Sequence, residues 1–320
     1  MNKSHLYQQG YTLLELMIAI TLGLIVTAAA TQLILGSFLT TKLQEASAQI
    51  QDKGLFGLNY ILRDVQLLNF GNSNQYEIKK TTPRAGIVLT AGAGSTNLTA
   101  TVNGLTDLTA IVTSSGHDSG MKTLKSDQLT IQFVAPTNMA NCEGIDVRRG
   151  DLVVQRYFLR EDNNSLALAC DANTPTPTTI QVADPDNPGE TVSQANPVNS
   201  NPTVINGLGG EGQVIIPQVD QFKVLIGGMN ATGQLAYYDI DTFKTKADLR
   251  AVALKLSLLV RSDVAVPSSQ IDPAANFRLF GVENTALTDQ LDNTTNANKI
   301  PRQLYVATVA IRNGLGENPE

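Results

Sequence analysis

The stretch GYTLLELMIAITLGLIVTAAATQLILGSFL, residues 10–39, decides the fold of this chain. It contains one charged residue, Glu15, and the run from Leu16 to Leu39 that follows contains none. At about 1.5 Å of rise per residue, a helix over this run is long enough to cross the hydrocarbon core of a bilayer, which is about 30 Å thick. We therefore predict a membrane-spanning helix over about 13–39.

Glu15 stands at the head of this apolar helix and needs a partner, because a charged side chain inside hydrocarbon costs at least ~2.5–3.5 kcal/mol. If the chain is cut after Gly10, the new α-amine of Tyr11 lies about one helical turn from Glu15, at a helix N-terminus whose dipole favours a carboxylate. Gly10 suits such a cut because a small residue lets a protease backbone approach closely. We expect cleavage between Gly10 and Tyr11, with Glu15 partnered by the new amine.

Two other interpretations of the apolar run are open. An ordinary secretory signal would be cut after Ala30, since residues 28–30 fit a small-x-small site. The run is longer than a usual signal, however, and it carries Glu15 at its front. A plain single-span anchor also fits the length, but it leaves Glu15 without a role.

Helical periodicity continues beyond the apolar run, and no proline precedes Pro83. Apolar or small residues recur at steps of three and four: Leu43, Ala46, Ile50, Gly54, Leu58, Ile61, Val65 and Leu68. This stripe predicts one helix over 11–70, roughly 90 Å long. Its polar residues lie off the stripe and are expected to face solvent: Lys42, Glu45, Asp52, Lys53, Arg63 and Asp64. The second half of the helix should pack on a globular head.

Residues 71–320 have the pattern of a β-rich head. Short β-type runs separated by Gly, Asn, Ser and Pro occur at 86–90, 108–113, 128–134, 152–159, 166–170, 214–216, 221–226, 252–260, 278–282 and 303–312. We predict the α+β class, a long helix packed on a mainly antiparallel sheet. Residues 174–202 hold six of the thirteen prolines and are expected to form an acidic surface loop.

Composition limits the functions that the head can have. The chain has 320 residues, is 42% hydrophobic and 16% charged, and carries a net charge of −6. This is enough material for one sizeable domain besides the helix, or for two small ones. The acidic balance argues against nucleic-acid binding as the main activity. Two pairs of adjacent basic residues, Lys79-Lys80 and Arg148-Arg149, are interpreted as solvated charges in loops.

The two cysteines, Cys142 and Cys170, lie beyond the membrane segment. If the head lies in an oxidising compartment outside the membrane, we expect the two cysteines to form a disulfide. By the chain-entropy account, this bond would stabilise the head by about 3–4 kcal/mol. Two separate buried thiols are the alternative. With a single histidine outside residues 1–10, the chain cannot form a standard tetrahedral zinc site.

Few residues offer chemistry for catalysis or metal binding. Oxygen-bearing side chains at Asp184, Asp186, Asn187 and Glu190 make a weak calcium candidate, although they lack the alternation of a calcium-binding loop. A solvated turn is the simpler interpretation. His117 stands in a Ser- and Gly-rich segment and is expected to be a solvated loop residue. We therefore expect neither an enzyme nor a cofactor.

The beginning of the chain resembles the class III signal of type IV prepilins. It has a short hydrophilic leader over 1–10 with Lys3 and no acid, then Gly10, an aromatic residue, Thr12-Leu13, and Glu15 four positions after the aromatic. Tyr11 stands where most members have Phe. The resemblance implies cleavage by a prepilin peptidase and N-methylation of Tyr11. It also implies that Glu15 is neutralised in the assembled state by an N-terminal amine, its own or a neighbour's.

The rest of the chain resembles the PilW group of type IV pilus minor pilins. The similar segments are 126–133, 153–159, 168–170, 219–225, 251–262 and 304–313, with the two cysteines in the order strand, Cys, strand, Cys. The J-type pseudopilins of type II secretion share this architecture. A third possibility is a membrane-anchored protein that binds a ligand with residues 174–202.

The resemblance to PilW implies a structural subunit that helps to initiate pilus assembly in a priming or tip complex. Its implied partners are the prepilin peptidase, other minor pilins, the major pilin, the inner-membrane platform protein, a tip adhesin and membrane lipid. The implied location is the bacterial inner membrane, with one membrane-spanning segment and the head in the periplasm, and later the fibre or its tip. Pili of this kind serve twitching motility, DNA uptake or adhesion.

Overall fold

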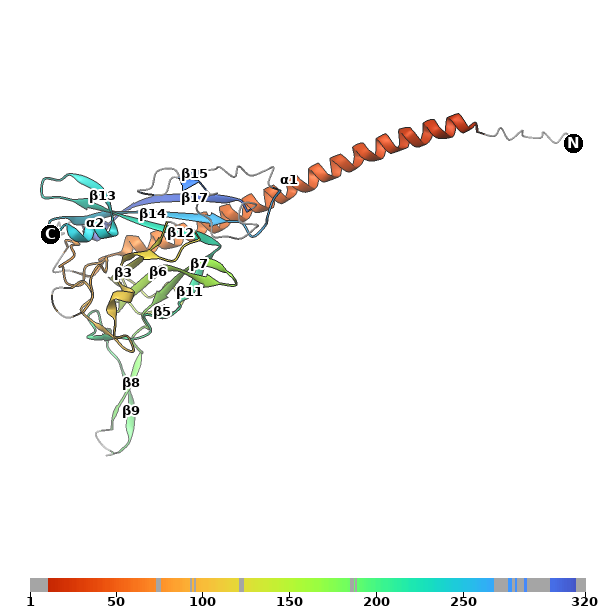
Figure 1. The fold of residues 1–320 in the computed structure, drawn as a ribbon. Helices are drawn as coiled ribbons and strands as arrows, with labels where there is room; N and C mark the ends of the chain where they lie inside the picture. Colours follow the sequence, from red (N-terminus) through yellow and green to blue (C-terminus); the bar gives the residue numbers. More distant parts are fainter. Residues whose placement is uncertain are drawn as a thin grey trace.

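A long helix joined to a β-sheet head makes up the chain (Figure 1). The computed structural model describes residues 11–72, 76–92, 94, 96–120, 124–184, 187, 189–267, 276–277, 280, 285–286 and 300–314. The C-terminal half of the helix packs against antiparallel sheets, and the N-terminal half projects away from the head. The predicted α+β class is confirmed.

Helix α1 runs over Leu13–Leu67, 55 residues. Thr12 caps its N-terminus, and the chain leaves it through Asn69 and Gly71, which both have positive φ. The helix has two halves with opposite environments: residues 11–38 are exposed, whereas the apolar stripe is buried from Ala46 onward. Among the described residues, α1 is the one helix long and apolar enough to span a membrane, with a mean hydropathy of 2.2 over its most apolar window.

The head contains two antiparallel sheets. The five-stranded sheet has the order β11-β7-β6-β3-β2, formed by Gln213–Pro217, Ser165–Ala172, Leu152–Asp162, Ser126–Val134 and Ser114–His117. The four-stranded sheet has the order β13-β12-β14-β17, formed by Leu235–Asp239, Val219–Met229, Arg250–Arg261 and Arg302–Ala310.

Short elements complete the head. The two-stranded pairs are β1 (Thr101–Val102) with β10 (Val204–Ile205), β4 (Met139–Ala140) with β5 (Asp146–Val147), β8 (Thr179–Ala183) with β9 (Thr191–Ala195), and β15 (Asn276–Phe277) with β16 (Thr285–Ala286). The short helices are η1 (Leu108–Ile111), α2 (Ile240–Thr245) and η4 (Arg312–Gly314).

One hydrophobic core unites the helix and both sheets. It includes Ile61 and Val65 of α1, Phe133 of β3, and Phe222 and Leu258 of the four-stranded sheet. The two sheets are also joined by polar contacts, because Asp127 on β3 accepts hydrogen bonds from Lys223 Nζ (2.6 Å) and from the Val224 amide (2.8 Å). The head is therefore one packed unit, and α1 is part of its core.

Several predicted strands differ from the structure. The predicted strand at 108–113 is instead the 3₁₀ helix η1 over Leu108–Ile111, because the side chain of Asp107 accepts a hydrogen bond from the Thr109 amide (2.9 Å) and caps a helical turn. Residues 86–90 form an isolated bridge between Ile87 and Ile131. The predicted strand at 278–282 lies almost wholly outside the described residues. The sequence pattern also missed α2 and β13.

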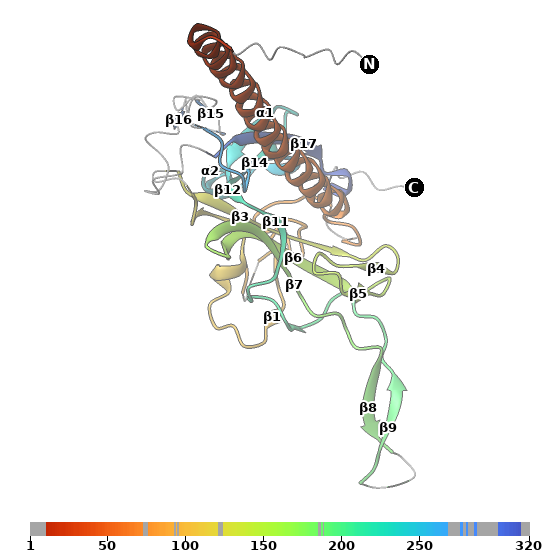
Figure 2. The same cartoon turned by 90° about the vertical axis from the view of Figure 1, so that its right-hand side faces the viewer.

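The predicted surface loop at 174–202 contains a β-hairpin. Strands β8 and β9 pair antiparallel, with Thr179 opposite Ala195 and Val182 opposite Val192. The hairpin projects from the head, away from α1 (Figure 2). Threonine and valine favour extended backbone, and this local preference was hidden by the surrounding prolines.

Candidate functional site

The first candidate site is the N-terminal end of α1, where Glu15 folds back on Thr12. The Thr12 amide donates to Glu15 Oε2 (3.1 Å), and the Glu15 amide donates to Thr12 Oγ1 (3.2 Å). This reciprocal pair is a capping box, which satisfies two amides that a helix N-terminus leaves open. The carboxylate is thereby held at the very start of the helix, next to Tyr11.

The capping box adds a partner for Glu15 that the sequence analysis overlooked. The pattern Thr12-x-x-Glu15 before an apolar run is itself a signature of a helix start, so the signal was present. Gly10 lies outside the described residues. Cleavage after Gly10 and N-methylation of Tyr11 therefore stay predictions.

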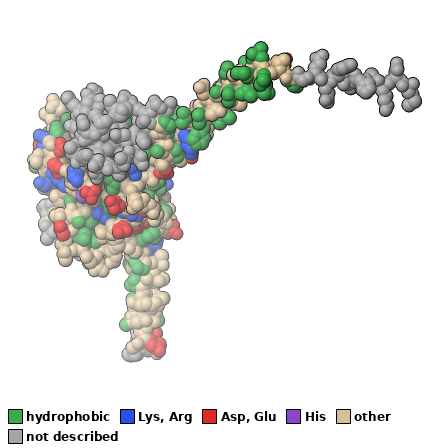
Figure 3. Space-filling model, turned by 45° about the vertical axis from the view of Figure 1, so that its right-hand side comes forward, with side chains coloured by type: hydrophobic (Ala, Val, Ile, Leu, Met, Phe, Trp, Pro, Cys, Tyr) green, Lys and Arg blue, Asp and Glu red, His purple; other side chains and the backbone are tan. Residues whose placement is uncertain are grey.

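The exposed half of α1 presents an apolar surface on which three threonine hydroxyls are satisfied within the helix. The hydroxyls of Thr21, Thr27 and Thr31 donate to backbone carbonyls one turn earlier, at 2.9, 2.9 and 2.8 Å. In a low-dielectric surrounding each unsatisfied polar group is expensive, so this arrangement suits lipid or other apolar helices. Figure 3 shows hydrophobic side chains covering the projecting part of the helix.

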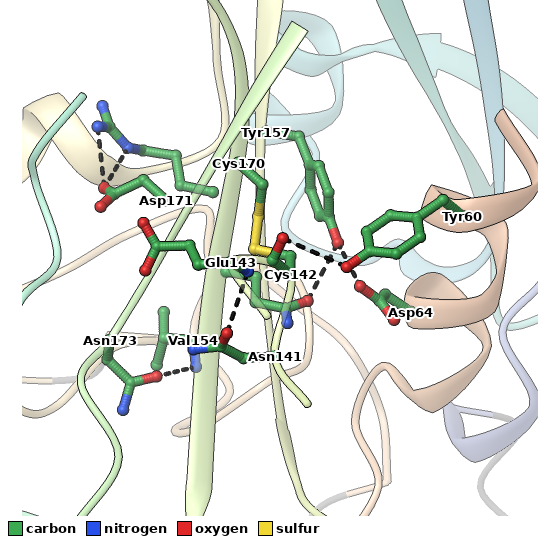
Figure 4. The surroundings of a disulfide bond; sticks show 12 residues. Tyr60, Asp64, Asn141, Cys142, Glu143, Val154, Tyr157, Cys170, Asp171 and Asn173 are labelled. Carbon is green, nitrogen blue, oxygen red and sulfur yellow. Dashed lines mark hydrogen bonds and ion pairs between the residues drawn. A yellow bond between two sulfur atoms is a disulfide. The ribbon is translucent and has the colours of Figure 1, made fainter. Parts of the chain in front are cut away.

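The second candidate site is the place where the other end of α1 meets the disulfide (Figure 4). Cys142, in the turn between β4 and β5, is bonded to Cys170 on β7, with 6.1 Å between the Cα atoms. This is the pair expected from the sequence. The hydroxyl of Tyr60 on α1 donates to the Cys142 carbonyl (3.2 Å).

Asp64 is buried at this contact, with 1% of its surface exposed, and the expectation that it faces solvent is wrong. It lies between Ile61 and Val65 on the face of α1 that enters the core. Its carboxylate accepts a hydrogen bond from the fully buried hydroxyl of Tyr157 on β6 (2.7 Å). A buried Tyr hydroxyl needs such a partner. The stripe pattern could not reveal this because the partner comes from a distant strand.

Gln155 connects Asp64 to the disulfide. With its amide nitrogen facing Asp64, Gln155 donates to Asp64 Oδ2 (3.1 Å), and its oxygen accepts from the Cys142 amide (2.8 Å). Burial raises the pKa of the Asp64 carboxyl, against the opposing effects of the Tyr157 hydrogen bond and of Arg63. Burial also raises the pKa of Tyr157. The cluster is a continuous polar network inside the core.

We predict that Asp64→Asn reduces the pH dependence of stability. Because the folded-state pKa of Asp64 is raised, its contribution is fully present below the unfolded pKa of about 3.9 and is lost as the pH rises through the folded pKa. The wild-type free energy of unfolding should therefore fall more between pH 4 and pH 7 than that of the variant, measured by urea titration of the full chain in detergent. Equal falls would contradict this prediction.

A second substitution at the same position tests the hydrogen bond. Asp64→Leu leaves the Tyr157 hydroxyl without this acceptor, which should lower the free energy of unfolding by about 1–3 kcal/mol.

Asp127 and Glu143 also have pKa values raised mainly by burial. Some pH dependence should therefore remain in every Asp64 variant.

His117 is not in a solvated loop, contrary to expectation. It ends strand β2 and is half-buried, and its Nε2 lies 2.8 Å from Ser114 Oγ. Burial lowers the pKa of His117, and Arg156 adds to this effect. The Ser114 hydroxyl also lies within hydrogen-bond distance of the Val112 carbonyl (3.2 Å). Within the described part of the chain, no carboxylate accepts a hydrogen bond from the His117 ring, so the pair has the form of a strand-end contact.

The calcium candidate has internal contacts at the tip of the β8–β9 hairpin. Asn187 Nδ2 donates to Asp184 Oδ2 (3.2 Å), and the Asp184 amide donates to the Glu190 carbonyl (2.9 Å). Asp186 lies outside the described residues. Across the described ranges, no group of three or more His, Cys, Asp or Glu side chains is placed to hold a metal ion.

Comparisons with known proteins bear on the N-terminal end of α1. Residues 6–31 match the family described as the prokaryotic N-terminal methylation motif. No curated protein matches the chain. Among solved structures, the chain is similar to the type IV-like pilin TTHA1219 from Thermus thermophilus, with 12% identity, a TM-score of 0.35, and coverage of 82% of this chain and 96% of that chain. The matched motif includes Gly10, Tyr11 and Glu15.

Proposed function

We propose that this chain is a minor pilin that takes part in initiating type IV pilus assembly. The observation that carries the proposal is the exposed apolar half of α1, which begins with the Thr12–Glu15 capping box and overlaps the methylation motif over 6–31. A prepilin peptidase cuts the chain after Gly10. The head then lies in the periplasm, and the helix is held in the inner membrane until the subunit joins other minor pilins and the major pilin.

The chemistry of the helix surface supports assembly through α1. Lipid tails and neighbouring apolar helices are equally apolar, so moving the helix from one to the other yields little hydrophobic free energy. Charge then has a large influence on how subunits align. Glu15 is the only charged residue from Tyr11 to Thr41. Its carboxylate is the natural partner for the free amine of Tyr11 in the same or a neighbouring subunit.

The test is a comparison of Glu15→Ala and Glu15→Gln. Glutamine serves at this position of a capping box, so Glu15→Gln keeps the helix start and removes only the charge. We expect both variants to be processed and inserted in the inner membrane. Both should co-purify poorly with partner pilins and restore few surface pili in a strain lacking the native gene.

Glu45→Ala is the matched control, since Glu45 is an exposed acid of the same helix outside the apolar run and pairs with Lys42 (3.3 Å). It should assemble normally. Wild-type piliation by Glu15→Gln would overturn the role of the charge. Rescue of type II secretion instead of piliation by the wild-type gene would favour a J-type pseudopilin.

A further inference from the structure

We infer that the Cys142–Cys170 disulfide acts on helix α1 rather than on the sheet that contains Cys170: it holds a small turn that clamps the last turns of the helix to the head. This inference goes beyond the proposed function, and its test does not depend on pilus assembly. It rests on the contacts made by the turn that carries Cys142.

The turn from Asn141 to Ile145 is a self-contained unit. The Asn141 side-chain oxygen accepts hydrogen bonds from the amides of Glu143 (3.0 Å) and Ile145 (2.9 Å), and the Asn141 amide donates to the Ile145 carbonyl (2.9 Å). The flanking strands β4 and β5 have two residues each and pair only with one another. Such a short ladder does not join the turn to the strand pairing of either main sheet, and the Glu143 carboxylate makes one side-chain contact with β7 by accepting a hydrogen bond from the Ala172 amide.

Contacts on two sides connect this turn to the rest of the core. On one side, the disulfide joins Cys142 to Cys170, which is fully buried in the central part of β7. On the side of α1, the Cys142 carbonyl accepts a hydrogen bond from Tyr60, and the Cys142 amide donates one to Gln155 on β6, which in turn donates to Asp64 on α1. The disulfide thus fixes the position of a backbone group that α1 uses as a hydrogen-bond acceptor.

The sheet itself depends little on the disulfide. Strand β7 is hydrogen-bonded to β6 over 155–162 and 165–172 and to β11 on its other edge. Cys170 therefore has both ladder neighbours with or without its sulfur bond. The groups that lose a fixed partner when the turn moves are Tyr60 and, through Gln155, the buried Asp64.

The clamp has a consequence for the geometry of the whole subunit. Tyr60 and Asp64 lie one turn apart near the end of α1, and the exposed apolar half extends rigidly from the same helix. A small rotation of the clamped end would therefore be magnified at Glu15. If the chain works as the proposed minor pilin, the disulfide sets the angle at which the apolar half is offered to neighbouring subunits.

Hydrogen exchange of the full chain in detergent tests the inference. In Cys142→Ser/Cys170→Ser, amides of α1 over 57–67 should exchange at least about tenfold faster, while amides of β7 and β11, in the sheet that contains Cys170, keep their wild-type rates. A uniform increase in exchange rate over the helix and the sheets would overturn the inference, because the disulfide would then stabilise the whole head equally. Unchanged rates in 57–67, or faster exchange confined to 139–147, would overturn it as well.

Two variants that keep the disulfide make the test independent of folding without it. Tyr60→Phe removes the hydroxyl that reaches Cys142 and should speed exchange in the same stretch of α1. Tyr305→Phe is the matched control, since it removes another bond between head and helix, from Tyr305 to the Ile50 carbonyl (3.0 Å). Its effect should be confined to residues near Ile50. Equal exchange patterns in the two variants would contradict a specific clamp.

Discussion

The variant Gly10→Glu will remain uncut, with an intact mass that still includes residues 1–10, whereas the wild-type protein will begin at Tyr11. The reason is steric and electrostatic, because the side chain at the scissile position must let the protease backbone approach closely and Glu adds both bulk and charge. The loss of cleavage should be nearly complete. Intact-mass spectrometry of protein purified from membranes measures it directly.

Failure of this cut should also prevent assembly. An uncut subunit has no free amine at Tyr11, so the carboxylate held at the start of α1 by the capping box lacks its expected partner. Gln9→Glu is a suitable control, since it adds the same charge one residue before the scissile position and should still be cut. A wild-type N-terminus following Ala30 would contradict the prepilin interpretation and indicate a secretory signal.

The second large effect is a loss of stability, expected when alanine replaces the glycines of α1 that face the head. An ideal Cβ built on Gly54 would lie 2.1 Å from the Tyr305 ring, and one on Gly57 would lie 2.2 Å from the buried Ile216. Alanine is a better helix former than glycine by about 1 kcal/mol, but overpacking typically costs about 1–3 kcal/mol. We expect packing to dominate at both positions, since the ring of Tyr305 is rigid and Ile216 has little room to move.

Gly54→Ala/Gly57→Ala should therefore lower the free energy of unfolding of the head by up to about 4 kcal/mol, the sum over two sites of about 1–3 kcal/mol of overpacking less about 1 kcal/mol of helix propensity. Gly36→Ala is the matched control, because nothing lies within 4 Å of its added Cβ. Urea unfolding followed by tyrosine fluorescence suits this measurement, since the chain has no tryptophan. A double variant as stable as the control would show that the helix can shift without loss.

These glycines mark a difference between sequence patterns and packing. From the sequence, Gly54 was assigned to an apolar stripe, and the structure places it there, at a point where the ring of Tyr305 occupies the space that a Cβ would need. His117 and Asp64 were both misplaced for a related reason. Their surroundings come from residues far away in the chain, and the local pattern around them carries no information about those residues.

Local sequence by itself determined that the chain begins with a long apolar helix, that a single acid stands at its head, and that β-strands follow. These features depend on interactions within a few residues: helical periodicity, the absence of charge, the absence of proline, and strand propensity. Only the tertiary structure decided that Asp64 is buried against Tyr157 and that the head packs directly on Gly54 and Gly57. It also decided that the turn carrying Cys142 accepts a hydrogen bond from α1. Such contacts join surfaces separated by many residues in sequence, and which surfaces meet is set by the packing of the whole core.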